Sequence, residues 1–437
     1  MKRTNRLLAK GLLMMALANT AGAGELRDYV ARDDSAFSWE IHETVSRAGA
    51  SVHLVELTSQ EWRGITWTHW LSVVVPETVR HPDRAILMVA GGRNRPDPPD
   101  ARSREAQVFT NIAVQTGAPV AILQQVPNQP LYEDLTEDAL IAHTFDRYLE
   151  EGDADWPLLL PMVKSAVRAM DALTEIGVET GDFSAEQFVV MGASKRGWTS
   201  WLTAAVDSRV SAVVPMVIDM LNIGPQLDRQ EKSYGGYSEM ISDYEDYGII
   251  ERFDTPDGRR LSSIIDPYAY RRDLTLPKLV VLGTNDPYWT VDASSLYLND
   301  LKGETHLHYA ANAGHSLDLS IIPTVLGFLQ LVLNDQPRPE LQWERDSGNR
   351  FSVSWNPAGR AEAYLWEAES SSRDFREAQW RSRRLVSENG EAELEFDPPQ
   401  QGWSARYVEV RFPNAAGGFP LNLSTTITVL SAGETAD

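Results

Sequence analysis

A serine at the junction of an apolar strand and an amphipathic helix is the residue of this chain best placed to do chemistry. The run Phe188–Trp198 reads FVVMGASKRGW. The apolar stretch ends at Gly192, Ser194 stands two residues later, and a helical pattern follows directly after the serine. Glycine two residues before the serine keeps such a tight turn free of side-chain clash. The start of the helix presents free backbone N–H groups to an oxyanion. The layout therefore predicts a nucleophilic serine.

A serine hydroxyl becomes a useful nucleophile only when a histidine takes its proton and a carboxylate orients that histidine. In the strand-to-helix elbow of α/β-hydrolases the chain order is serine, acid, histidine. The buried strand expected at Pro277–Leu282 leads into the loop GTNDP, which places Asp286 at the sheet edge that carries Ser194. The same residues also fit a plain turn. Asp219, which ends the preceding strand, and Asp292 are the alternative acids.

The base is expected after the last strand of the sheet. His315 lies in the loop ANAGHS, between the strand Thr305–Ala310 and the last apolar helix. An isolated loop histidine is often only a surface residue, but here its position and the order of the chain select it. His143, on an expected helix, is an alternative that no further feature favours.

Two hydrogen-bond donors are needed to stabilise the oxyanion. The backbone N–H of Lys195, next to the nucleophile, is the first candidate. The second is the turn Gly91-Gly92-Arg93, directly after the strand Ala85–Ala90, where glycines let the backbone approach a substrate closely. The alternative is that these residues form a plain tight turn.

The elbow departs from the common pattern Gly-x-Ser-x-Gly, because Arg196 stands two residues after the serine and Gly197 three after it. A bulky residue at that place requires the helix to pack differently against the strand. The spacing Gly-x-Ser-basic-x-Gly resembles the elbow of glucuronoyl esterases, in which the basic residue helps to bind the oxyanion. The resemblance implies that the Lys195 ammonium contributes there. The alternative is that Lys195 and Arg196 are solvated residues of the first helical turn.

The pattern of the chain before Pro337 predicts a mostly parallel sheet with helices, the α/β class. Residues 39–76 fit antiparallel strands that lead into this sheet, and helices are expected at Leu160–Leu173 and Ile321–Leu333. The polar, tyrosine-rich region of about 223–272 lacks strand signals and is expected to form a cap over the site. The six apolar strand candidates are Ala85–Ala90, Pro119–Val126, Phe188–Met191, Val210–Ile218, Pro277–Leu282 and Thr305–Ala310.

The pattern after Pro339 changes to a period of two, as in Phe351, Val353 and Trp355. Short strands with Gly, Pro and Asn turns predict an all-β sandwich of the immunoglobulin or fibronectin type. The two patterns predict an α/β-hydrolase domain at 24–336 and a β-sandwich domain at 338–431. A signal peptide is expected before them, at 1–23.

The N-terminal segment and the composition limit the function further. Basic residues, a short apolar run and the small residues Ala21-Gly22-Ala23 predict a secretory signal, so the protein is expected to be periplasmic or secreted. No later segment is long and apolar enough to span a membrane. The formal net charge of −22 argues against nucleic-acid or anionic-membrane partners. The chain has no cysteine, no metal-ligand pattern and no nucleotide fingerprint, so no cofactor or metal is expected.

Several long segments resemble the PhoPQ-activated pathogenicity-related proteins, and the resemblance runs from about Trp39 to Leu430. It implies an α/β-hydrolase fold but no substrate. Asp286 aligns with the family's acid segment, although Asn285 replaces the usual glycine, and Asn312–Leu317 matches the family pattern Asn-x-x-His-Ser-Leu. The other matching segments are Trp67–Trp70, Gln125–Leu131, Glu137–Leu140, Leu160–Met162, Gly192–Val210, Val217–Asn222, Tyr234–Tyr237 and Ile265–Tyr268.

These observations predict an exported serine hydrolase, esterase- or peptidase-like, that acts on a small molecule, a peptide or a carbohydrate ester. Ser194, Asp286 and His315 are its expected catalytic residues. The alternative is a non-catalytic binding or signalling protein on a hydrolase scaffold. Aromatic residues expected near the site could line a substrate pocket or only pack in the cap and core; they are Tyr234, Tyr237, Tyr288 and Trp289.

Overall fold

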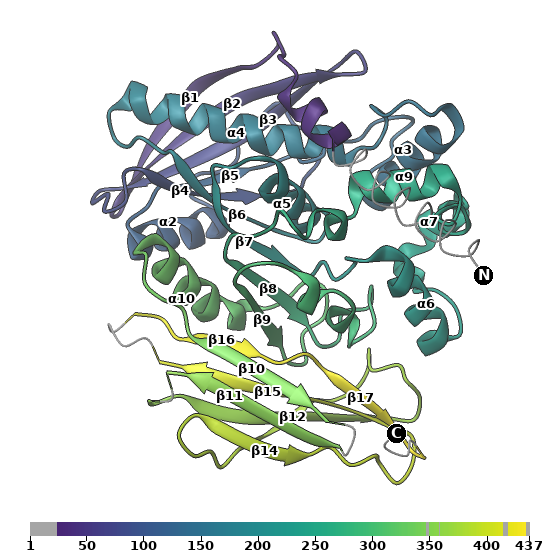
Figure 1. Ribbon diagram of the computed structural model, residues 1–437. Helices are drawn as coiled ribbons and strands as arrows, with labels where there is room; N and C mark the ends of the chain where they lie inside the picture. Colours follow the sequence, from purple (N-terminus) through teal and green to yellow (C-terminus); the bar gives the residue numbers. More distant parts are fainter. Residues whose placement is uncertain (1–23, 347–348, 358, 414–417, 434–437) are drawn as a thin grey trace, which may run out of the picture.

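A mixed nine-stranded sheet runs through the first part of the chain (Figure 1). The computed structural model describes residues 24–346, 349–357, 359–413 and 418–433, so the expected signal peptide lies outside the described residues. The strand order is β1-β2-β3-β5-β4-β6-β7-β8-β9. The strands are β1 (Ser38–Arg47), β2 (Ala50–Trp62), β3 (Ile65–Pro76), β4 (Arg84–Val89), β5 (Val120–Leu123), β6 (Gln187–Ala193), β7 (Val210–Met216), β8 (Lys278–Gly283) and β9 (Thr305–Ala310).

Pairing in this sheet is antiparallel from β1 to β5 and parallel from β5 to β9. Every residue of β5 and β8 is buried, as expected for parallel strands that are covered on both faces. Val190 packs into one core and its neighbour Val189 into the other, because successive side chains of a strand point to opposite faces.

Helices cover both faces of the sheet. Residues of α4 (Leu159–Thr180) and α5 (Lys195–Val206) share the first core with the strands, and those of α2 (Arg104–Thr116) and α10 (Ile322–Leu333) share the second. The helix expected at Leu160–Leu173 is longer in the structure because its last turns still pack against Phe183, which lies in contact with Gly177. The strand expected at Pro119–Val126 is shorter, since Gln125 turns into a left-handed backbone conformation with φ of 63°.

The region between β7 and β8 is helical. It contains α6 (Ile223–Tyr234), α7 (Ser242–Asp246), α8 (Ile249–Arg252) and α9 (Pro256–Ile265). These helices gather with α3 (Glu137–Glu151) at one end of the sheet (Figure 1). The turn that carries Ser194, between β6 and the following helix, lies at the same end of the sheet.

The last part of the chain forms two antiparallel sheets that share one apolar core. The predicted α/β-hydrolase-type sheet followed by an all-β C-terminal part is thus confirmed. The first sheet contains β10 (Glu340–Arg345), β11 (Arg350–Asn356) and β14 (Glu391–Glu395). The second contains β13 (Arg381–Arg384), β12 (Glu362–Ser370), β15 (Trp403–Phe412), β16 (Leu421–Ser424) and β17 (Thr428–Ser431).

The second of these sheets packs against the edge of the main sheet beside β9 and α10 (Figure 1). The backbone N–H of Tyr309 donates to Ser424 Oγ at 3.1 Å, and the Tyr309 ring contacts the Tyr407 ring at 5.2 Å between centroids. A Cβ at Gly327 would lie 2.4 Å from Pro420 O, so the helix and the strand approach too closely for any side chain there. Strand β15 therefore buries side chains on both faces, with Tyr407 in one core and Val408 in the other, whereas all of β13 is exposed.

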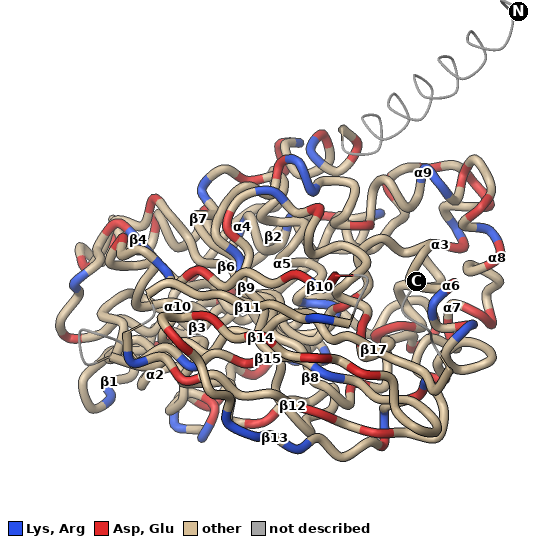
Figure 2. Tube along the Cα trace, turned by 60° about the horizontal axis from the view of Figure 1, so that its bottom comes forward, with Lys and Arg blue, Asp and Glu red and all other residues tan. Residues whose placement is uncertain are grey.

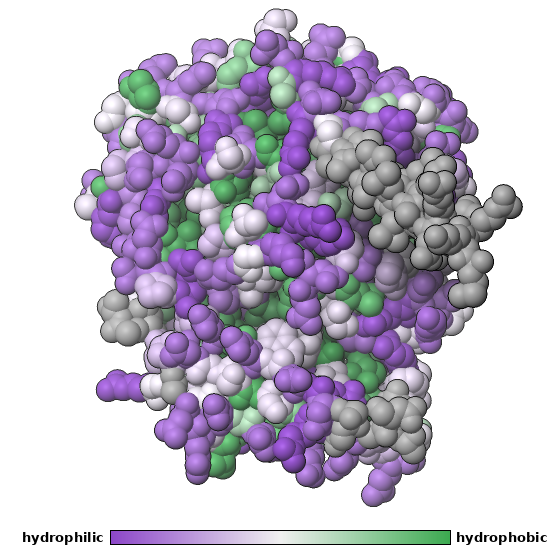
Figure 3. Space-filling model, viewed as in Figure 1, coloured by the Kyte–Doolittle hydropathy of each residue, from purple (hydrophilic) through white to green (hydrophobic). Residues whose placement is uncertain are grey.

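Acidic and basic residues are mixed along the Cα trace (Figure 2). On the face shown in Figure 3, hydrophilic side chains predominate and apolar ones lie in small separate groups. None of the helices in the described part of the chain has the length and apolarity that crossing a membrane requires.

Candidate active site

Ser194 occupies a strained turn between β6 and α5. Its φ and ψ are 57° and −129°, a conformation that costs free energy for a residue other than glycine and is common at functional sites. A Cβ at Gly192 would lie 2.5 Å from Arg196 O and 2.9 Å from Ser200 Oγ, so glycine is needed there. The strand-to-helix turn expected from the sequence is therefore present.

The shifted second glycine of the elbow has a packing explanation. At Gly197 an added Cβ would lie 2.8 Å from Ile218 Cγ2 and 3.0 Å from Gly192 O, so the helix packs too closely against its neighbours for a side chain at this position. Arg196 instead points toward the segment before α3. Its guanidinium donates to Val126 O at 2.5 Å and to both carboxylate oxygens of Glu137 at 2.7 Å.

Glu137 belongs to the first turn of α3, so this bidentate pair ties the elbow to that helix. Burial opposes ionisation of Glu137, but its hydrogen bonds with Arg196 and the charge of that residue prevail and lower its pKa to about 2. The alternative in which Lys195 and Arg196 are solvated is wrong, because their side chains are 12% and 10% exposed.

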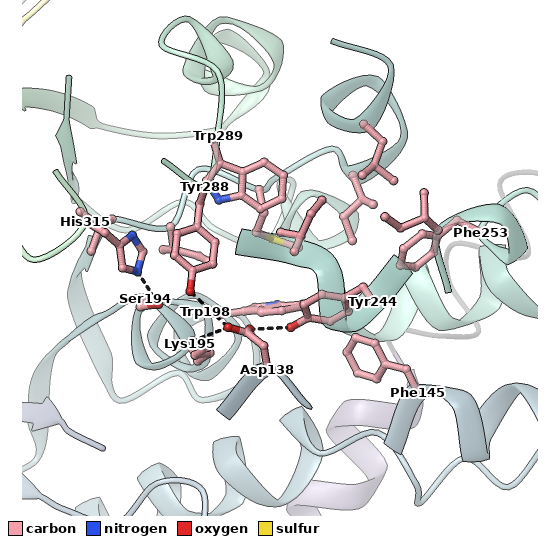
Figure 4. Close-up of a pocket in the computed structure, with 17 residues that line it drawn as sticks. Asp138, Phe145, Ser194, Lys195, Trp198, Tyr244, Phe253, Tyr288, Trp289 and His315 are labelled. Atoms are coloured by element: carbon pink, nitrogen blue, oxygen red, sulfur yellow. Dashed lines mark hydrogen bonds and ion pairs between the residues drawn. The ribbon is translucent and has the colours of Figure 1, made fainter. Parts of the chain in front are cut away.

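His315 lies between the serine and the acid (Figure 4 shows it beside Ser194). Its Nε2 is 2.8 Å from Ser194 Oγ, and its Nδ1 is 2.8 Å from Asp286 Oδ2 and 3.0 Å from Oδ1. The carboxylate favours the tautomer with the proton on Nδ1, which leaves Nε2 free to accept the serine proton. Asp286 Oδ1 also accepts from the Tyr288 N–H at 2.9 Å, which fixes the carboxylate.

The alternative acids and the alternative base lie in other environments. Asp292 is held by the guanidinium groups of Arg229 at 2.9 Å and Arg373 at 2.6 Å. Burial raises the pKa of Asp219 to about 8, so at neutral pH this side chain is mostly uncharged. His143 packs against aromatic rings, among them Tyr132 at 5.1 Å between centroids.

Asp138 is a site residue that the sequence reasoning missed. Its Oδ2 lies 2.6 Å from Lys195 Nζ and accepts from Tyr288 at 3.2 Å, and its Oδ1 accepts from Tyr244 at 2.9 Å (Figure 4). Burial and the Asp138 charge raise the pKa of Tyr288, so its hydroxyl remains a donor. The only available signal was the matching segment Glu137–Leu140, since an acidic first turn is ordinary helix chemistry.

Tyr288 also stacks on the histidine. Its ring centroid lies 4.2 Å from that of His315, with the two planes at 32°. The hydroxyl of the same residue donates to Asp138. Tyr288 therefore connects the ion pair of Lys195 with the base.

The expected oxyanion donors lie near the elbow. Val89 at the end of β4 pairs with Gly192, so the turn Gly91-Gly92-Arg93 leaves the sheet beside Ser194. Arg196 fills the space next to Gly91, where an added Cβ would lie 2.5 Å from the guanidinium carbon. These three residues do not line the cavity at Ser194, whereas Lys195 does.

A cavity of about 630 Å³, counting its open mouth, adjoins Ser194 and His315. Tyr288 and Trp289, for which the sequence left both a pocket role and plain packing open, line this cavity. Tyr234 and Tyr237 do not line it; the Tyr234 hydroxyl instead donates to Trp289 O at 3.0 Å. Among the described residues there is no group of acidic and histidine side chains that could hold a metal ion.

Several known proteins are similar to this chain in sequence or in structure. The sequence profile of the PhoPQ-activated pathogenicity-related proteins matches residues 26–376. Autocrine proliferation repressor protein A of Dictyostelium discoideum is 30% identical over 440 residues, which cover 92% of this chain and 88% of that protein. Acetyl xylan esterase 1 from Thermoanaerobacterium sp. JW/SL YS485 has a similar fold, with a TM-score of 0.51 and 16% identity over 72% of this chain and 93% of that chain. An acetyl xylan esterase from Paenibacillus sp. R4 has a TM-score of 0.48 and 14% identity over 70% of this chain and 92% of that chain.

Proposed function

The chain belongs to the PhoPQ-activated pathogenicity-related protein family, and from its site we propose that it is a serine hydrolase acting on ester or amide bonds. The observation that carries this proposal is the double hydrogen bonding of His315, to Ser194 on one side and to Asp286 on the other. A hydroxyl, a histidine and a carboxylate in this geometry are the parts of an activated nucleophile.

In the proposed reaction, Ser194 Oγ attacks the carbonyl carbon while His315 Nε2 accepts its proton. The tetrahedral intermediate collapses, the bond to the leaving alcohol or amine breaks, and His315 returns the proton to that group. Water then attacks the acyl-enzyme, giving one proton to His315. The acid departs and Ser194 regains its proton. Asp286 holds the imidazole and stabilises its charged form throughout.

The oxyanion of both intermediates needs two N–H donors. We assign the first to the backbone of Lys195, the first residue of α5, and the second to the turn Gly91-Gly92-Arg93 beside the elbow. We also assign the helical region of 223–272 to a cap, because its side chains line the cavity at Ser194. The C-terminal sheets are assigned to a separate domain beginning at about residue 338.

Export is part of the proposal. The basic and apolar segment before Ala23 predicts cleavage after that residue. Expression of the full chain in a bacterium with a periplasm, followed by N-terminal sequencing of the periplasmic protein, is expected to show Gly24 as the first residue. Protein that retains Met1 and stays in the cytoplasm would contradict export without affecting the proposed chemistry.

A fluorophosphonate probe tests the central claim, because it reacts with activated serines. We expect labelling of the wild type and of Ser184→Ala, a matched control at an exposed serine, and loss of labelling in Ser194→Ala and His315→Ala. Circular dichroism establishes that each variant is folded. A folded wild type that the probe does not label would contradict the proposal.

A further inference from the structure

The cavity that starts at Ser194 has apolar walls over most of its extent. The wall is built by the end of β7, by α3 and α5, and by the helices between β7 and β8. Many of the lining side chains are aliphatic or aromatic; they include Phe145, Ile223, Leu227, Ile241, Ile250 and Phe253. A group that fills this space is removed from water against hydrocarbon, which favours apolar groups.

Several polar side chains that line the cavity are already bonded to protein groups. Lys195 and Tyr244 both contact the Asp138 carboxylate, and the Trp198 indole donates to Ile265 O at 2.5 Å. A sugar or a peptide backbone entering the cavity would lose its hydrogen bonds to water and find few replacements.

The cavity is elongated. Figure 4 shows Ser194 and His315 at one end, Tyr244 in the middle, and Phe253 at the other end. Phe145 and Tyr244 lie between the ion pair and that far end. The space therefore fits a chain or a ring that extends away from the nucleophile.

We propose that this cavity binds an apolar group of the substrate, a chain of several carbons or an aromatic ring attached close to the scissile carbonyl. Esters of such groups are then hydrolysed in preference to acetylated sugars. The inference rests on the proposed hydrolase activity and names the substrate class of the same site. Each methylene that enters the cavity is expected to raise kcat/KM about fourfold until the far end is reached.

Two series of esters test the proposal with the full mature chain. The first is 4-nitrophenyl acetate, butyrate, hexanoate and octanoate, and the second is methyl, butyl and octyl acetate. We expect kcat/KM to rise at least about tenfold from the shortest to the longest member of one series, and to exceed that for acetylated xylo-oligosaccharide. Equal values across both series, or a preference for the acetylated sugar, would overturn it.

Two variants test whether the preference for longer esters arises in this cavity. Phe253→Ala lengthens it and is expected to move the preferred chain to longer esters, whereas Leu227→Phe shortens it and is expected to move the preference to shorter ones. Phe37→Ala removes a half-buried phenylalanine outside the cavity and should keep the wild-type preference. Preferences that do not move in either folded variant would overturn the assignment to this cavity.

Failure of this inference can be distinguished from failure of the proposed function. If the fluorophosphonate labels Ser194 and acetate esters are hydrolysed without any gain from longer chains, the serine hydrolase stands and the apolar substrate class is wrong. If the probe does not label the protein and no ester is hydrolysed, both are wrong.

Discussion

Asn312 and Trp380 exchange two hydrogen bonds between the histidine loop and the C-terminal region. Asn312 Nδ2 donates to Trp380 O at 3.1 Å, and the Trp380 N–H donates to Asn312 Oδ1 at 2.8 Å. Asn285, next to the acid, makes a similar link by donating to Arg376 O at 3.0 Å and to Ala378 O at 2.8 Å. The segment between β12 and β13 thus holds the loops of both Asp286 and His315.

This link predicts that Asn312 is a positioning residue. Asn312 has φ of 60°, so Asn312→Gly keeps the left-handed backbone accessible while it removes both side-chain bonds. We expect kcat to fall about tenfold with little change in KM, because a displaced histidine weakens proton transfer more than substrate binding. Steady-state kinetics with a reactive ester measure this split.

The matched control is Asn389→Gly, which alters another left-handed asparagine in an exposed turn of the C-terminal sheets. It should lower stability slightly and leave kcat unchanged. Equal kinetics for Asn312→Gly and the wild type would show that the C-terminal segment does not position the base.

The elbow and the triad candidates could be predicted because their signals are local. Ser194, Asp286 and His315 each follow an apolar strand of the sheet, and the carboxyl ends of parallel strands meet at one edge. Asp138 could not be found in this way, since its role depends on Lys195, which is distant in sequence. The same holds for Asn312, whose partner Trp380 belongs to another part of the fold.

The ion pair of Lys195 with Asp138 gives a second prediction. Both side chains are 12% exposed, so Lys195→Met leaves a nearly buried carboxylate without its cation and is expected to destabilise the protein by about 3 kcal/mol. The change also disturbs Tyr288, which donates to Asp138 and stacks on His315, so turnover should fall. Thermal unfolding and ester hydrolysis measure the two effects.

The double variant Lys195→Met/Asp138→Asn separates two roles of the lysine. If the ammonium only balances Asp138, removal of both charges restores most of the stability and most of the turnover. If the ammonium binds the oxyanion, the double variant regains stability but kcat remains about 10²-fold low. From the 2.6 Å contact we expect the first result.

Asp219 provides a pH-dependent prediction. Burial raises its pKa to about 8, and the charges of Asp286 and Asp292 add to the shift, whereas an unfolded chain has a value of about 3.9. The folded state therefore holds a proton that the unfolded state releases between about pH 4 and pH 8. Its stabilising contribution is complete below pH 4 and is lost as the pH rises, by at most about 1.4 kcal/mol per pH unit.

Asp219→Asn copies the uncharged form at every pH. Its free energy of unfolding relative to the wild type should consequently increase from pH 5 to pH 8, as urea denaturation can measure. Because His315 contacts Asp286, turnover should stay near the wild-type value in Asp219→Asn and fall by about 10⁴-fold in Asp286→Asn. A stability difference that is the same at pH 5 and pH 8 would show that Asp219 is already charged in the folded protein. A large loss of turnover in Asp219→Asn would transfer the role of the acid to this residue.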